Sequence, residues 1–279
     1  MQIGVSPTVF WLSDLAACRA AAIVFDEAGF DHFTLGGHVM TAEEGRYPQR
    51  PPITYAAPYR DPFVFFSSLA PVTSRIRFRT SVLILPMLAT VTVAKQAADL
   101  ATLSDGRLDL GVGISWNAQE YRALGQSFNG RARRLEEQIE VLRLLWTQPY
   151  VSFSGEFHEI DGLGLGSLPP AIPIWFGSGP AEAPMRRVGR LGDGWLPILG
   201  AAQETTTRLR AYAQQAGRSP EQIEIAGSVT AGDDVIAQAE AQIAGGATQL
   251  TVGAPAALGQ AEGIEAILNA GQALRSAGL

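Results

Sequence analysis

Cysteine and lysine are almost absent from this chain of 279 residues. Each occurs once, as Cys18 and Lys95. A single cysteine excludes an internal disulfide, and because Cys18 falls in a helical pattern we expect it to be buried and unreactive.

Clusters of positive charge and long apolar runs are also missing. The chain has 21 basic and 27 acidic residues, a net charge of −6, and no basic cluster, so nucleic acid is not an expected partner. No stretch of about 18 uncharged apolar residues occurs, so no membrane span is expected. The first residues, MQIGVSPTVF, lack the charged and apolar segments of a signal peptide, and we expect a cytoplasmic protein.

The sequence shows no machinery for metal catalysis or hydrolysis. The three histidines, His32, His38 and His158, lack the spacing of metal ligands, and no Asp/Glu cluster accompanies them. No metal is therefore expected. There is no G-x-S-x-G turn and no plausible cysteine nucleophile, so hydrolysis has no obvious catalytic group.

The central phrase of the chain predicts a strand, a helix and a second strand. Residues 76–86 are rich in β-branched and apolar residues up to Pro86, residues 91–104 have helical spacing, and residues 108–114 form a short apolar run. A helix between two apolar strands indicates a parallel pair with a right-handed crossover.

The same strand-then-helix pattern repeats along the whole chain. The predicted strands are 3–7, 31–39, 76–86, 108–114, 172–179, 194–198, 223–229 and 248–254. Eight such units predict an α/β fold, a (β/α)8 TIM barrel formed by residues 1–279 as a single domain. A loop at 40–60 and an insertion at about 149–171, before strand 5, interrupt the pattern. An open doubly wound sheet is the alternative, but Trp116 replaces the third glycine of a dinucleotide fingerprint after Gly111 and Gly113.

The active site of such a barrel lies at the carboxyl ends of its strands, and one candidate there is a glycine-rich turn. Gly177, Ser178, Gly179 and Pro180 join the fifth strand to a helix. Backbone N–H groups, the hydroxyl and the helix N-terminus would suit a phosphate. An ordinary glycine-rich connection is the alternative. Neither Arg186 nor Arg187 can be assumed to help, since both lie well into the helix.

His38 is the only histidine at the carboxyl end of a predicted strand. Imidazole exchanges protons near neutral pH, so His38 is the candidate acid/base group. A histidine bonded structurally in the barrel rim is the alternative. For His32 and His158, at other positions, a structural role is favoured.

Aromatic residues gather in the rim loops, as a site for a flat conjugated ligand requires. They are Trp11, Tyr47, Tyr55, Tyr59, Trp116 and Phe176. The loop at 40–60 is long enough to act as a lid, and we expect Tyr47, Tyr55, Tyr59 and Arg60 to shape a substrate pocket together with Trp11. A disordered linker is the alternative for this loop.

Five phrases resemble the luciferase-like flavin/deazaflavin oxidoreductases, and most closely the branch that depends on coenzyme F420. They are Gly37-His38-Val39, residues 80–83 before Pro86, AKQAADLATLSDGRLDLGVGISWN at 94–117, FSGEFHEIDGLGLGSLPPAIPIWFGSGP at 153–180, and RLGDGWLP at 190–197. They occur in the order of the family and span most of the first 200 residues, while the remainder fits by pattern only.

The resemblance implies a (β/α)8 barrel and a set of site residues. It implies a cis peptide at Ser81–Val82, on a bulge that backs the ring of the cofactor, and a proton-transfer role for His38. The remaining cofactor-binding residues implied are Gly37, Gly113, Trp116, Asn117, Gly177, Ser178, Gly179 and Pro180. Two residues depart from the pattern: Gly37 replaces an acidic residue that could tune His38, and Ser115 replaces a glycine.

Several functions remain open at this point. The resemblance favours an F420-dependent oxidoreductase that moves a hydride between the deazaflavin and a small organic substrate while His38 handles a proton. The alternatives are a monooxygenase using reduced FMN and O2, and a flavin-binding relative without catalysis. A sugar-phosphate isomerase on the same barrel would need a lysine or paired carboxylates that are lacking. The resemblance also implies a homodimer, for which the apolar faces of the second and third helices are the first candidates.

Overall fold

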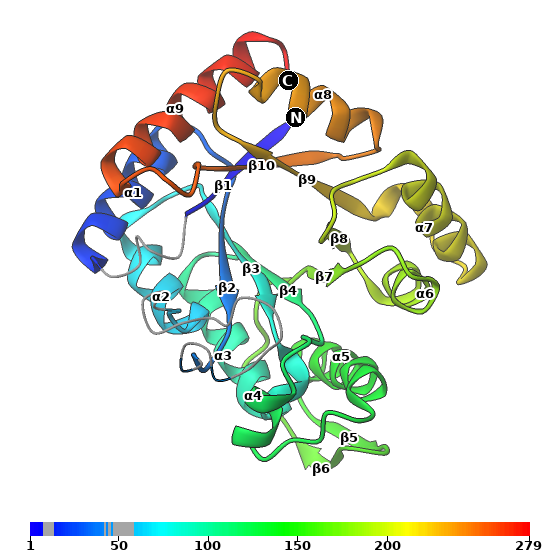
Figure 1. Cartoon of the computed structure of the whole chain (residues 1–279). Coiled ribbons are helices and arrows are strands. Elements are labelled where there is room, and N and C mark those ends of the chain that lie inside the picture. Colours follow the sequence, from blue (N-terminus) through cyan, green and yellow to red (C-terminus); the bar gives the residue numbers. More distant parts are fainter. Residues whose placement is uncertain (8–13, 42, 44–45, 47–58) are drawn as a thin grey trace.

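Eight parallel strands form a closed barrel surrounded by helices (Figure 1). The structure, a computed structural model, describes residues 1–7, 14–41, 43, 46 and 59–279. Around the barrel the strands follow the order β1-β10-β9-β8-β7-β4-β3-β2. Their bounds are β1 (Gln2–Ser6), β2 (His32–Gly37), β3 (Arg77–Leu83), β4 (Leu108–Val112), β7 (Ile174–Ser178), β8 (Gly194–Pro197), β9 (Glu224–Thr230) and β10 (Gln249–Gly253). The predicted (β/α)8 fold is confirmed.

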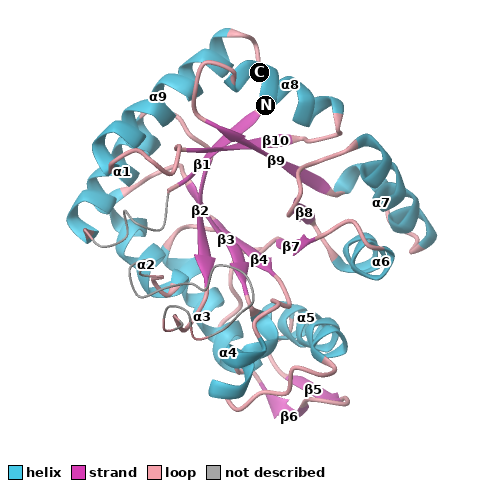
Figure 2. Cartoon of the chain, viewed as in Figure 1, coloured by secondary structure: helices cyan, strands magenta, loops and turns pink. Residues whose placement is uncertain are grey.

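The helices cover the outside of the barrel and the strands line its inside (Figure 2). Their bounds are α1 (Leu15–Glu27), α2 (Pro62–Leu69), α3 (Thr90–Leu103), α4 (Ala118–Ala123), α5 (Arg131–Thr147), α6 (Glu182–Leu191), α7 (Gln203–Gln215), α8 (Val235–Ala244) and α9 (Gln260–Ser276). Helical spacing places apolar residues on the face toward the strands: α3 buries Val93, Ala97 and Leu100. Among the described residues, no helix has the length and apolarity needed to cross a membrane.

Strand β3 ends earlier than the sequence predicted. It stops at Leu83, and a 3₁₀ helix at Leu85–Met87 follows, where the apolar run was expected to continue as a strand to Pro86. Burial explains the error, because Leu85, Pro86 and Met87 are all buried and an apolar run marks burial in a turn as well as in a strand. The chain therefore turns away from the barrel just after Ser81 and Val82.

The insertion contains an antiparallel hairpin that the sequence did not predict. It consists of β5 (Val151–Ser154) and β6 (Glu159–Leu163), which lie beside α5 in Figure 1. Val151 and Ile160 are buried against the core. The hairpin is also held by His158, whose Nδ1 lies 2.8 Å from Oε1 of Glu137 on α5.

Polar side chains close the amino end of the barrel. Arg79 is 2% exposed, donates from Nη2 to Oδ2 of Asp109 at 2.9 Å and from Nη1 to Oε1 of Gln249 at 2.6 Å, and stacks over the ring of Trp175. A buried guanidinium needs such partners, because an unpaired one would lose its hydration without compensation. The open end of the barrel is therefore the other one, at the carboxyl ends of the strands.

Candidate functional site

Two adjoining cavities open at the carboxyl ends of the barrel strands. The larger, of about 630 Å³, is called the His38 cavity here; the smaller, of about 400 Å³, is called the mouth lobe. The His38 cavity is lined by Gly36, His38, Tyr59, Ser81, Val82, Ile84, Gly113, Ile114, Ser115, Trp116, Leu135, Phe176, Gly177, Ser178, Gly179, Pro184, Arg187, Val188, Ile198 and Leu199. Ser81, Val82, Gly177 and Ile198 line both spaces, so the two are continuous.

The ridge between the two cavities is the end of β3. The Ser81–Val82 peptide is cis, as the family resemblance implied. A Cβ atom at Gly113 would lie 2.7 Å from Cγ2 of Val82, and one at Gly177 would lie 2.6 Å from Cγ1. Both distances are below van der Waals contact, so glycine just after β4 and on β7 is what lets the Val82 side chain lie between them.

The turn after β7 forms one end of the His38 cavity. Gly177, Ser178 and Gly179 line it, and a Cβ at Gly179 would meet no atom within 4 Å, so the backbone there is open to a ligand. The Ser178 hydroxyl accepts a hydrogen bond from Nε1 of Trp195 at 3.0 Å. Helix α6 begins just beyond, and its residues Pro184, Arg187 and Val188 also line the cavity.

Arg187 brings a positive charge to this end of the cavity. Its side chain is 11% exposed and donates from Nε to Oε1 of Glu136 at 2.8 Å. Arg187 could not be selected from the sequence, because whether its side chain faces the cavity depends on where α6 begins. Arg186, by contrast, has a side chain that is 55% exposed and pairs with Glu182 on the outer surface of the helix. The turn and Arg187 together fit a phosphate group.

His38 lies at the other end of the cavity, against a buried carboxylate. Its Nδ1 is 2.8 Å from Oε2 of Glu120, and its side chain is 20% exposed while that of Glu120 is 2% exposed. A carboxylate only accepts, so Nδ1 carries the proton and Nε2 of a neutral ring is an acceptor. Among the described residues nothing bonds Nε2, which leaves it available to a ligand.

Glu120 is held ionised by the groups around it. Burial raises the pKa of this carboxyl, but the hydrogen bond and charge of His38 and the N–H groups of Met40 and Val39 more than offset burial, and the pKa is lowered overall. The two N–H groups donate to Oε1 at 3.2 and 3.0 Å. Gly37 was expected to leave His38 without a carboxylate; Glu120, 82 residues further along the chain, supplies one.

Tyr59 packs against the same histidine. Its ring meets the His38 ring edge to face, with centroids 5.3 Å apart. Burial raises the pKa of the Tyr59 hydroxyl, and the nearby charge of Glu120 raises it further. The phenol is therefore neutral near pH 7 and can donate or accept a hydrogen bond in the cavity.

A short helix carries Glu120 into place. Asn117 caps α4, accepting from the N–H of Gln119 at 3.1 Å, and its Nδ2 donates to Oε2 of Glu120 at 3.0 Å. Ser115 precedes it with φ of +52°, in the left-handed region where glycine is favoured, and its hydroxyl accepts from the Asn117 N–H at 3.1 Å. The hydroxyl thus supports a left-handed backbone conformation at the position where the family resemblance led us to expect glycine.

We therefore expect Ser115→Ala to destabilise the protein more than Ser115→Gly. Alanine keeps the strained positive φ and loses the hydrogen bond, which should lower the free energy of unfolding by about 1–2 kcal/mol. Glycine also loses the hydrogen bond, but it adopts a positive φ without strain. Urea unfolding of both variants measures this difference. An alanine variant as stable as the glycine variant would show that the left-handed conformation at this position costs nothing.

The structure brings together most of the cofactor-binding residues that the sequence predicted. Ser81, Val82, Gly113, Trp116, Gly177, Ser178 and Gly179 all line the His38 cavity with His38 and Tyr59. Four other predicted residues are not among the residues that line the cavity: Gly37, Asn117, Pro180 and Arg60. A Cβ at Gly37 would point at Leu83 and Pro62, away from the cavity. Trp11, Tyr47 and Tyr55 lie outside the described residues.

The other two histidines have structural surroundings. His32 is buried in the barrel with Nε2 2.9 Å from the Thr251 hydroxyl, and His158 lies between Glu137 and Thr90. Among the residues that the structure describes, no three His, Cys, Asp or Glu side chains are grouped as a metal site would require.

The paired histidine and the open glycine turn lie at the carboxyl ends of the strands, where (β/α)8 barrel enzymes have their active sites. The chain matches the family model of luciferase-like monooxygenases over residues 4–278. It belongs to this family.

Two proteins of Mycobacterium tuberculosis illustrate the relatives of this chain. An uncharacterized protein of Mycobacterium tuberculosis is 35% identical over 211 residues, covering 72% of this chain and 73% of the relative. The F420-dependent hydroxymycolic acid dehydrogenase of Mycobacterium tuberculosis is 31% identical over 218 residues, covering 73% of this chain and 60% of the relative.

Solved structures agree with the fold. An F420-dependent secondary alcohol dehydrogenase, solved with an F420-acetone adduct, has a TM-score of 0.79 at 18% identity. The matched region covers 98% of this chain and 99% of the dehydrogenase chain. A monooxygenase from Streptomyces bottropensis has a TM-score of 0.73 at 20% identity, covering 99% of both chains. At these identities the likeness concerns the fold.

Proposed function

We propose that this protein is an F420-dependent oxidoreductase that transfers a hydride between the deazaflavin and a small organic substrate. The observation that carries the proposal is His38, fixed by Glu120 with Nε2 unbonded, in one cavity with an open turn and a guanidinium suited to phosphate. The relationship to an F420-dependent dehydrogenase supports the same cofactor.

The residues of the His38 cavity fit a ring joined to a phosphate. The ring would rest on the Ser81–Val82 ridge, and the phosphate would meet the Gly177–Gly179 turn, with Arg187 on the same side. When bound, F420 supplies a carbon that accepts or donates a hydride. Each hydride that leaves or joins a substrate carbon requires one proton to leave or join the substrate oxygen.

His38 would handle that proton at Nε2. Glu120 holds the proton of the ring on Nδ1, so Nε2 takes a proton from a substrate hydroxyl, and the imidazolium that forms is stabilised by the carboxylate. In the opposite direction the imidazolium returns the proton. Trp116, 43% exposed at the rim, would cover the ring and help to exclude water.

A monooxygenase using reduced FMN and O2 is the second candidate. Flavin and deazaflavin carry the same kind of ribityl phosphate, and the turn and Arg187 suit both. The family model that the chain matches is that of luciferase-like monooxygenases, and the monooxygenase from Streptomyces bottropensis shares the fold over 99% of the chain.

Replacing Arg187 with alanine tests the phosphate end of the site. Loss of a charged hydrogen bond of about 1.5–3 kcal/mol should weaken cofactor binding by about 10- to 100-fold. Arg186→Ala is the matched control, since it removes the same charge one residue away on the outer surface. Fluorescence titration with F420 and with FMN measures both. If both variants lost the same cofactor affinity, binding would depend on the overall charge of the protein and not on the position of Arg187.

We also propose a homodimer formed through α2 and α3. Val64, Val91 and Leu103 are apolar residues on these helices that are 71%, 49% and 65% exposed. Sedimentation at several protein concentrations measures the oligomeric state, and a monomer at every concentration would contradict this proposal.

A further inference from the structure

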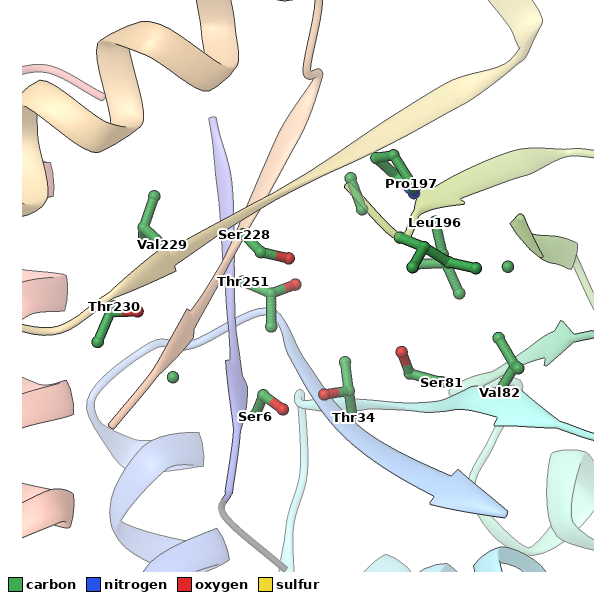
Figure 3. Close-up of a pocket in the computed structure, with 14 residues that line it drawn as sticks. Ser6, Thr34, Ser81, Val82, Leu196, Pro197, Ser228, Val229, Thr230 and Thr251 are labelled. Atoms are coloured by element: carbon green, nitrogen blue, oxygen red, sulfur yellow. The ribbon is translucent and has the colours of Figure 1, made fainter. Parts of the chain in front are cut away.

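The mouth lobe has a lining unlike that of the His38 cavity. The barrel strands and the residue after β8 contribute Ser6, Thr34, Ser81, Val82, Gly177, Leu196, Pro197, Ile198, Ala226, Ser228, Val229, Thr230, Thr251 and Gly253 (Figure 3). Six of these side chains carry a hydroxyl and none is ionisable. The His38 cavity, by contrast, contains His38 and Arg187.

Hydroxyl groups from several strands face the same space. Figure 3 shows the oxygens of Ser6, Ser81, Ser228 and Thr251 directed toward the centre of the lobe. Thr251 is bonded to His32, but the hydroxyls of Ser6, Ser81 and Ser228 have no hydrogen-bond partner among the described residues. Each can donate one hydrogen bond and accept others, so a ligand oxygen or hydroxyl entering here finds partners on more than one side.

The floor of the lobe supplies no charge either. Burial lowers the pKa of the His32 imidazole well below its usual value, and the charges of Arg79 and Arg77 lower it further, so the ring behind Thr251 is neutral. The Arg79 guanidinium, deeper in the barrel, is paired with Asp109. An anion entering the lobe would lose its hydration without gaining a cation.

The opposite wall is apolar. Leu196, Pro197 and Ile198 form it at the end of β8, and Ile198 is 68% exposed. Figure 3 places Leu196 and Pro197 across the lobe from Ser228 and Thr251. A ligand that fits both walls has a polar end and an apolar body.

We propose that the mouth lobe is the substrate subsite and selects an uncharged organic molecule bearing a hydroxyl or carbonyl group. Carboxylates, phosphates and ammonium compounds are rejected because the lobe offers them no opposite charge. The assignment of this molecule as substrate rests on the proposed oxidoreductase function, since the lobe meets the His38 cavity at the Ser81–Val82 ridge. A substrate in the lobe would thus have its reacting carbon beside the ring of the cofactor.

The test compares three probes of one size: cyclohexanol, cyclohexanone and cyclohexanecarboxylate. Ligand-observed NMR measures their binding to the cofactor-free and the F420-loaded protein. We expect both neutral probes to bind at least about tenfold more tightly than the carboxylate. Carboxylate binding as tight as that of the neutral probes, or no binding of any probe, would overturn the proposal.

A positive charge introduced into the lobe should weaken this preference for neutral probes. Ser228 is exposed in the lobe, so Ser228→Lys adds a cation at its wall, and Ser228→Met adds a side chain of similar length without charge. We expect the lysine variant to gain carboxylate binding by about tenfold and the methionine variant to gain none. Unchanged carboxylate binding in the lysine variant would contradict the proposed subsite.

The same experiment separates the two proposals. If the F420 assignment is wrong, FMN binds more tightly than F420 or neither binds, but the cofactor-free protein keeps its preference for neutral probes. If the lobe assignment is wrong, F420 binds and the probes show no preference.

Discussion

Replacing His38 with alanine should lower kcat by about 10²- to 10⁴-fold while leaving the affinity for the cofactor nearly unchanged. The reason is that His38 is bonded to Glu120 through Nδ1 and presents only Nε2 to the cavity, so its main contribution is proton transfer. Steady-state kinetics with the substrate that the neutral probes identify, together with cofactor titration, measure the two effects separately. Added imidazole should restore part of the rate.

His158→Ala is the matched control for this substitution. His158 is also paired through Nδ1 with a glutamate, Glu137, at the same 2.8 Å, but it lies on the hairpin and not in the cavity. This variant should be less stable and should keep its kcat below its melting temperature. If the two alanine variants lost equal activity, the effect of His38 would be one of folding and not of proton transfer.

Glu120 should be the most costly residue to remove from the site. Glu120→Ala leaves His38 Nδ1 and the N–H groups of Val39 and Met40 without an acceptor in a buried place, and we expect a loss of about 3 kcal/mol of stability. Glu120→Gln keeps an acceptor but no charge. It should lower kcat by about 10- to 100-fold with a smaller loss of stability, because the imidazolium is no longer stabilised.

The pH dependence of stability provides a second check on Glu120. Its pKa is lowered in the folded protein, so its stabilising contribution is present above the usual pKa of a glutamate and is lost as pH falls through the folded pKa. The difference in unfolding free energy between the wild type and Glu120→Gln should therefore be constant near neutral pH and shrink in acid. A difference that grows in acid would contradict this account.

The barrel could be predicted from sequence because its strands are short, buried and apolar. Every residue of β4 is buried, and a buried parallel strand reads as an apolar run. The same reasoning failed at Pro86, where burial continues into a 3₁₀ helix. It also missed α4, whose six residues are too few for a periodic pattern to emerge.

The site was predicted in part, for a related reason. His38 and the Gly177–Gly179 turn follow strands directly, and a strand end is a position that sequence can locate. Glu120 lies on the unpredicted helix α4, and its burial beside His38 depends on how α4 packs. Arg187 lines the cavity and Arg186 does not, because consecutive residues of a helix point in different directions. To predict which of the two enters the cavity, one would need to know the exact start of α6.

The central claim is that the His38 cavity holds a deazaflavin, and a titration of the cofactor-free protein with F420 and with FMN tests it most directly. The account predicts that F420 quenches protein fluorescence at lower concentration than FMN, and that Arg187→Ala weakens its binding while Arg186→Ala does not. Tighter binding of FMN would move the function to an oxygen-using monooxygenase. Binding of neither would contradict the cofactor site itself.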